Sequence, residues 1–120
     1  MEYEFDDKLP IYIQIINHLK KDIVSGRLKP GDKLPSVREL SSILKVNPNT
    51  IARVYQELER EGITFTQRGM GTFIKEDSTM INEIKKEMAK EIIDGFLENM
   101  RKLGFGKEQV MEIVDKGWKE

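Results

Sequence analysis

The sequence predicts a mainly α-helical fold with one small β-hairpin, in which an N-terminal winged helix-turn-helix precedes two C-terminal helices. Three observations lead to this prediction. Apolar residues recur at helical spacing between residues 10 and 62, two short segments of strand character flank a glycine turn, and the rest has helical patterns only. The two predicted domains, 1–76 and 77–120, meet at Asp77-Ser78.

The first predicted helix runs from Pro10 to Ser25. Proline suits a first helical turn, where its missing N–H removes no hydrogen bond. A stripe with i, i+3, i+4 spacing marks the buried face: Tyr12, Ile15, Ile16, Leu19 and Ile23. Gly26 then suits the left-handed position that ends a helix. A turn at 29–32 and a short extended piece at Lys33-Leu34 are expected to follow.

Two short helices separated by a tight turn are predicted next. Ser36 and Glu39 have the spacing of a capping box at the start of the second helix, whose inner face is Val37, Leu40 and Leu44. Asn47 is the predicted N-cap of the third helix, with Pro48 in its first turn. The inner face of this third helix comprises Ile51, Val54, Tyr55 and Leu58, and Gly62 ends it.

A hairpin follows the third helix directly. Residues 63–66 alternate apolar and polar side chains, which is typical of a half-buried strand, and residues 72–75 form the returning strand. Arg68-Gly69-Met70-Gly71 is the flexible turn between them. Three helices and a hairpin in this order predict a winged helix-turn-helix, which can insert its last helix into the major groove of DNA.

The C-terminal region reads as a long helix from Met80 to Lys102, a break at 104–106 and a last helix from Lys107. About 40 residues seldom hold a stable core alone. Packing on the winged domain is one interpretation; pairing with a second copy of the chain is the favoured one. The predicted dimerisation residues are Ile84, Met88, Ile92, Phe96, Met100 and Trp118.

Composition excludes several classes of protein. The chain has 120 residues, no cysteine and a formal net charge of −1, so neither disulfides nor a strongly basic surface is available. No apolar run approaches the roughly 18 residues of a membrane span, and the acidic N-terminus is unlike a signal peptide, so a cytoplasmic protein without a membrane partner is expected. His18, the only histidine, is expected on the surface. No catalytic set, metal site or cofactor is predicted.

The exposed side of the third helix carries side chains suited to reading base edges: Asn49, Ala52, Arg53, Gln56 and Arg60. Asparagine and glutamine can pair with adenine, and arginine can pair with guanine. Arg38 can clamp a phosphate from the second helix, or form a surface ion pair with Glu57 or Glu61. An ordinary solvated helix face is the alternative to the DNA-reading interpretation. The turn at 68–71 can lie along a minor groove or be a plain hairpin turn.

The sequence resembles the GntR family of bacterial transcription regulators. The residues that carry the resemblance cover most of residues 8–76: Pro10–Ile15, Ser25–Leu40, Glu57–Ile63 and Gly69–Ile74. Residues 46–55, together with the brief helical C-terminal region, are similar to the YtrA subfamily in particular. The resemblance implies a dimeric regulator, usually a repressor, whose targets are expected to include transporter operons.

The DNA contacts implied by the resemblance and the residue pattern together are Ser36, Arg38, Asn47, Asn49, Thr50, Arg53, Arg68, Gly69 and Gly71. Many relatives carry arginines where this chain has Pro48 and Ala52, so their operators cannot be transferred to it. Arg53 is expected to take over part of that contact. The expected partner is a near-palindromic double-stranded operator bound by a homodimer; any small-molecule effector is unassigned. The rival hypothesis is a winged-helix adaptor that binds protein instead of DNA.

Overall fold

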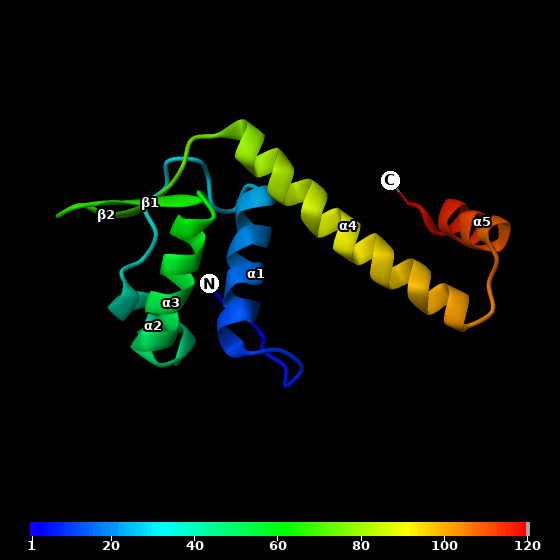
Figure 1. The fold of residues 1–120 in the computed structure, drawn as a ribbon, viewed down its shortest axis with the longest axis horizontal. Helices are drawn as coiled ribbons and strands as arrows, with labels where there is room; N and C mark the ends of the chain where they lie inside the picture. The colour runs from blue at the N-terminus through cyan, green and yellow to red at the C-terminus, as the bar shows by residue number, and fades with distance from the viewer. Residues whose placement is uncertain (120) are drawn as a thin grey trace. The chain divides into compact units, whose positions relative to one another are not determined.

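The computed structural model describes residues 1–119, so Glu120, the last residue of the predicted second domain, lies outside them. The chain divides into two compact units, Met1–Ile84 and a second that begins at Lys85. The element order confirms the predicted mainly helical fold with one hairpin (Figure 1): α1 Ile11–Val24, α2 Val37–Leu44, α3 Pro48–Arg60, β1 Thr64–Gln67, β2 Gly71–Ile74, α4 Ser78–Lys102 and α5 Lys107–Gly117.

Local sequence signals set the helix ends in the first unit. The Ser36 hydroxyl accepts from the Glu39 N–H at 3.0 Å, and the Glu39 carboxylate accepts from the Ser36 N–H at 3.0 Å, so the predicted capping box is present. Asn47 caps α3 with Pro48 directly after it, as predicted. Pro10 is the N-cap of α1, whereas the sequence placed it in the first helical turn, one position further into the helix. Gly26 has a φ of 84°, the left-handed conformation that ends α1.

The core of the first unit lies between α1, α2, α3 and the hairpin. Its central side chains have no exposed surface: Ile15, Leu19, Leu40, Ile51, Val54, Leu58 and Ile74. Burying each of them contributes roughly 1.5–3 kcal/mol before the entropy of ordering the chain is counted. The Tyr55 hydroxyl donates to the Pro35 carbonyl oxygen, which ties α3 to the segment that leads into α2. This core fixes the orientation of α3 in the unit.

The wing is broader than the predicted hairpin. β1 and β2 pair antiparallel, with Thr64 opposite Ile74 and Gln67 opposite Gly71. Lys33 forms a further antiparallel bridge to Phe73, and the Leu34 N–H donates to the Thr72 carbonyl oxygen at 2.8 Å. The short extended piece before α2 therefore pairs with β2 and extends the two-stranded sheet on that side. Its pairing anchors the base of the wing to the helix-turn-helix.

The buried face of the first strand differs from the alternation in the sequence. Thr64 is 1% exposed, whereas Phe65 is 39% exposed and stacks on Phe73 with ring centroids 5.6 Å apart. Ile63 is buried too. It precedes β1 and belongs to the turn that follows α3, so two consecutive side chains, Ile63 and Thr64, are buried. Apolar character predicted the strand correctly, but cross-strand pairing decided which of its side chains face the core.

The second unit consists of most of α4 together with α5, and its apolar side chains are largely uncovered. Val110 is buried, but Ile92, Met111 and Trp118 are 67%, 61% and 71% exposed. Trp118 follows α5 as its C-cap in extended conformation, so it lies just outside this helix, although the helix predicted from Lys107 onward was expected to include it. Ile84 is buried within the first unit, because that unit includes the first turns of α4.

Candidate nucleic-acid interface

The turn between α2 and α3 is held by a buried serine. The Ser41 hydroxyl donates to the Val46 carbonyl oxygen at 2.7 Å, and the Val46 N–H donates to the Ser41 carbonyl oxygen at 3.2 Å. Lys45 between them has a φ of 58°, which non-glycine residues seldom adopt. Ser41 thus donates one hydrogen bond and accepts another, and the two together hold an otherwise unfavourable backbone in the turn. The sequence pattern gave no indication of this role for Ser41.

The N-terminal end of α3 presents the predicted reading residues. Asn47 is exposed, and its side-chain oxygen accepts from the Asn49 N–H at 2.8 Å, while its amide N–H groups remain uncommitted. Asn49 is exposed, and Thr50 is half-buried. Hydrogen-bonding groups at the start of a helix suit contact with base edges and phosphates. The helix cap therefore uses the side-chain oxygen of Asn47, whereas the side chain of Asn49 is not needed for capping and can contact DNA.

The two arginines of α3 have different surroundings. Arg60 is held by Glu57, with its Nη2 2.8 Å from Glu57 Oε2 and its Nε at 3.2 Å from the same oxygen. This hydrogen bonding lowers the pKa of the Glu57 carboxyl group below its ordinary value. Arg53 is exposed, and its guanidinium carbon lies 3.7 Å from the centroid of the Tyr12 ring. Arg53 is thus the arginine of α3 without an ion pair in residues 1–119.

Arg38 on α2 is exposed, and both acidic partners considered for it are occupied. Glu57 pairs with Arg60, and Glu61 pairs with Lys20 at 3.0 Å. Within residues 1–119, no carboxylate lies within ion-pair distance of the Arg38 guanidinium. The surface ion pair with either residue is therefore absent, and the charge of Arg38 is available to a partner.

The wing brings a further cation to this surface. Arg68, Gly69 and Gly71 lie at or beside the hairpin tip, and both glycines have positive φ angles, of 79° and 124°. A Cβ atom on Gly71 would lie only 2.6 Å from Lys33 Cε, so the absent side chain is what lets the lysine stem cross the hairpin there. Lys33 was not among the predicted DNA-contact residues, although its position just before the second predicted helix could have indicated a cation beside the wing.

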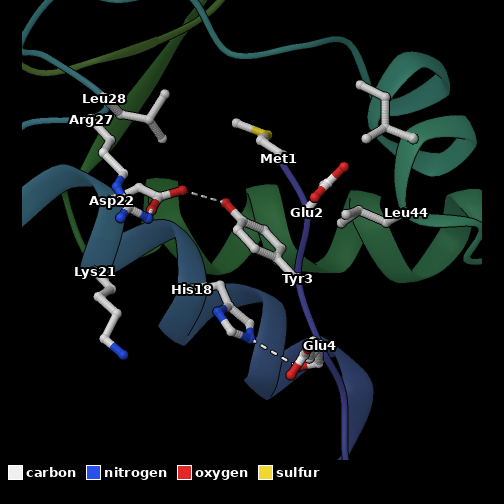
Figure 2. A pocket seen from close by; sticks show the side chains of 11 residues that line it. Met1, Glu2, Tyr3, Glu4, His18, Lys21, Asp22, Arg27, Leu28 and Leu44 are labelled. Carbon is white, nitrogen blue, oxygen red and sulfur yellow. Dashed lines mark hydrogen bonds and ion pairs between the residues drawn. The ribbon is translucent and has the colours of Figure 1, made fainter.

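A separate hollow of about 970 Å³ is lined by the N-terminal segment and α1, and two of its polar side chains, Tyr3 and His18, are tied to other lining residues (Figure 2). The Tyr3 hydroxyl donates to Asp22 Oδ2 at 2.8 Å, and burial and this bond raise the pKa of Tyr3. His18 Nε2 lies 3.2 Å from the Glu4 carbonyl oxygen, and its ring stacks on Tyr3 at 4.4 Å. His18 is thus a partly exposed residue of α1, as expected, and it also fastens the N-terminal segment to that helix.

Fold and surface together define a winged helix-turn-helix protein with exposed cations on α2, α3 and the wing and exposed amides on α3. Residues 11–74 match the family described as "Bacterial regulatory proteins, gntR family". The chain belongs to this family, as its sequence resemblance predicted, and its class is that of DNA-binding transcription regulators, not enzymes.

Individual relatives agree with this assignment. The chain is 47% identical over 106 residues to the HTH-type transcriptional repressor YtrA of Bacillus subtilis, a match that spans 88% of this chain and 82% of that one. It is 46% identical over 114 residues to the B. subtilis HTH-type transcriptional regulator YhcF, spanning 95% and 94%. A GntR family regulator from Listeria monocytogenes has a similar structure, with a TM-score of 0.87, 44% identity and coverage of 95% and 100%.

No helix in residues 1–119 has both the length and the apolar character needed to cross a bilayer. The same residues contain no group of three or more histidine, aspartate or glutamate side chains placed to hold a metal ion.

Proposed function

We propose that this chain is a homodimeric repressor that acts in the cytoplasm and binds a near-palindromic operator. In this proposal residues 1–76 form the DNA-binding domain and residues 77–120 the dimerisation region. The helix Asn47–Gly62 enters the major groove, and the wing at Arg68–Gly71 lies at the minor groove. The observation that carries the proposal is the unpaired state of Arg38 and Arg53 on an exposed helix-turn-helix surface.

The chemistry of this surface favours DNA over a protein partner. Asn49 can pair with adenine, Arg53 can pair with guanine, and Arg38 and Arg68 can contact phosphates. A protein-binding adaptor, the rival hypothesis, would favour apolar side chains on the free side of α3. That side instead carries Asn49, Arg53, Gln56 and Arg60. Because phosphate contacts release counterions, affinity for the operator is expected to fall steeply with salt.

The exposed apolar surface of the second unit supports the dimer. Phe96, Leu97 and Val110 line one apolar groove of about 700 Å³, and Met100 and Phe105 line a neighbouring one of about 400 Å³. A second copy related by two-fold symmetry would cover such a surface and place two α3 helices over two half-sites. Of the six predicted dimerisation residues, Ile84 is already buried in the first unit, so Met88, Ile92, Phe96, Met100 and Trp118 carry the proposal.

Selection of binding sites from random duplex DNA with the full-length protein tests this function. A near-palindromic consensus is the expected result, and a gel-shift titration on that duplex then measures each variant. Arg38→Ala is expected to weaken binding by about 1–3 kcal/mol if Arg38 reads a base, or to reduce the salt slope by about one if it contacts a phosphate. Arg60→Ala, which removes an arginine already paired with Glu57, is the matched control and is expected to have a much smaller effect.

Genomic mapping of the bound sites identifies the target genes. We expect a transporter operon among them, on the strength of the YtrA resemblance, and a reporter fused to that promoter should be more active when the protein is absent. Selection that yields no consensus, with the protein folded and dimeric, would favour the adaptor hypothesis.

A further inference from the structure

Arg53 is stacked on an aromatic ring from another helix. Its guanidinium carbon lies 3.7 Å from the centroid of the Tyr12 ring, well inside the roughly 6 Å limit of a cation–π contact. Tyr12 belongs to the first turn of α1, and Arg53 to the second turn of α3. Tyr12 is half-buried, whereas Arg53 is exposed. A fixed ring therefore supports one flat side of a solvent-facing cation.

This contact leaves the hydrogen-bonding edge of the guanidinium uncommitted. A stack uses the face of the planar group, whereas its five N–H donors lie in the plane. Glu57, one turn further along α3, is one competitor for these donors, but Arg60 holds its carboxylate at 2.8 Å. In the described residues, Arg53 has no ion pair. Arg53 thus combines a restricted position with a free edge.

Restriction of this kind matters for reading a base. A free arginine side chain loses rotamer freedom when it forms a contact, and a group already held in place loses less of it on binding. The bidentate contact of arginine with guanine needs two N–H donors of the guanidinium to lie in the plane of the base. A ring against the guanidinium restricts the orientations open to it before DNA arrives.

We propose that Tyr12 is a positioning residue that orients Arg53 for bidentate contact with a guanine in each half-site. The pair then determines the preference at that base pair, and Tyr12 acts through Arg53 without reading the base itself. This inference rests on the proposed function, because it assumes that α3 enters the major groove. It also explains how a chain with Pro48 and Ala52 on α3 obtains an arginine contact.

Two substitutions at Tyr12 separate the ring from the hydroxyl. Tyr12→Phe keeps the stack and removes the hydroxyl, whereas Tyr12→Leu removes the ring. We expect Tyr12→Leu to raise the dissociation constant for the selected operator about three- to tenfold and to relax the preference at one base pair per half-site. Tyr12→Phe should retain both affinity and preference. Arg53→Ala should relax the preference at the same base pair, and adding Tyr12→Leu to Arg53→Ala should cause little further loss.

A matched control is the same change at the other half-buried tyrosine of the N-terminal region. Tyr3→Leu also removes a stacked ring, from His18, and should lower the unfolding temperature without changing base preference. Thermal unfolding checks that every variant is folded. If Tyr12→Leu is not, Tyr12→Gln places a polar chain without a ring at this half-buried position and is measured instead.

The outcomes distinguish this inference from the proposed function. If Tyr12→Phe loses as much affinity as Tyr12→Leu, a hydroxyl contact with DNA is responsible and the positioning role is overturned. Additive losses in the double variant, or an unchanged base preference for Tyr12→Leu, would overturn it as well, while leaving the operator-binding proposal intact. A wild-type protein that selects no sequence would overturn the proposed function and this inference together.

Discussion

The two units of the chain bury their apolar side chains to very different degrees. In the first unit, side chains from three helices and the wing meet in a core in which Leu19, Leu40 and Leu58 have no exposed surface. In the second, Val110 is buried, while Ile92, Leu103 and Trp118 are exposed by two thirds or more. Helical periodicity is present in both. An amphipathic pattern therefore shows that one face of a helix must be covered, but it does not show which part of the chain, or which partner, covers it.

Size explains much of this difference. The first unit has enough elements to surround a core from several sides. The second has one helix segment and α5, and so few residues bury too little surface to offset the entropy of folding. Exposed apolar surface of this kind marks an interaction site in a natural protein. We therefore expect the stability of the second unit to depend on a partner chain, and that of the first not to.

The largest effect is expected from a charge in the exposed apolar surface of the second unit. Phe96→Asp should weaken dimerisation by on the order of 3 kcal/mol or more, because the carboxylate would be buried in the interface without a partner. Light scattering should then detect monomers where the wild type is dimeric, and the unfolding transition of the first unit should remain. Lys90→Asp, on the charged side of α4, is the matched control and should stay dimeric.

A wild-type chain that remains a stable monomer at micromolar concentration would contradict the proposed dimer. So would a Phe96→Asp variant that is folded and fully dimeric.

The next largest effect tests the closed core of the first unit. Leu58→Ala should lower the free energy of unfolding by about 2–5 kcal/mol, because it leaves a cavity among fully buried neighbours. Urea denaturation measures the change, which should not depend on protein concentration. Leu103→Ala makes the same chemical change at a side chain that is 72% exposed. At concentrations where the chain is monomeric, Leu103→Ala should change the free energy of unfolding by no more than about 0.5 kcal/mol. If Leu58→Ala and Leu103→Ala lowered the free energy of unfolding equally, the contrast between the two units would be refuted.

A smaller effect is expected at the capping box of α2. Ser36→Ala removes the acceptor for the Glu39 N–H and should destabilise the first unit by about 1 kcal/mol in urea denaturation. Ser42→Ala changes the same residue type within α2, at an exposed position away from the cap, and should change stability by less than about 0.5 kcal/mol. A result in which both variants are equally stable would show that the cap contributes nothing measurable.

The smallest effect is a pH dependence at the same cap. The hydrogen bond from the Ser36 N–H lowers the pKa of Glu39 from its ordinary value of 4.5. A lowered folded-state pKa stabilises the fold above the unfolded-state pKa, and this contribution is lost as pH falls through the folded-state pKa. The stability difference between wild type and Glu39→Gln should therefore be present at neutral pH and shrink as the pH drops below about 4.5. A difference that grows on acidification would contradict the cause given for the pKa shift.

Local signals in the sequence predicted the helix boundaries well. Ser36, Glu39 and Asn47 act through hydrogen bonds to backbone groups within three residues, and Gly26 acts through its own φ angle. Such effects need no knowledge of the rest of the chain, which is why the capping box and the start of α3 were both predicted correctly. The family resemblance had the same local basis, since it rests on contiguous motifs in residues 10–74.

Long-range contacts were the part that sequence patterns could not predict. Lys33 pairs with Phe73, which lies 40 positions further along the sequence, and the alternation of residues 63–66 did not reveal that Thr64, not Phe65, faces the core. The same limit applies to the surface of α3. Helical spacing placed Arg53 and Arg60 on one side, but only their neighbours Tyr12 and Glu57 distinguish an available arginine from an occupied one.

The sequence by itself determined the class of this protein, the ends of its helices and the set of polar residues at the start of α3, because these depend on neighbours along the chain. The tertiary structure decided which cations remain unpaired, that Lys33 crosses Gly71 at the wing, and that Tyr12 supports Arg53. The physical reason is that pairing and stacking depend on distances between side chains from different elements, which form only when the core of Met1–Ile84 closes.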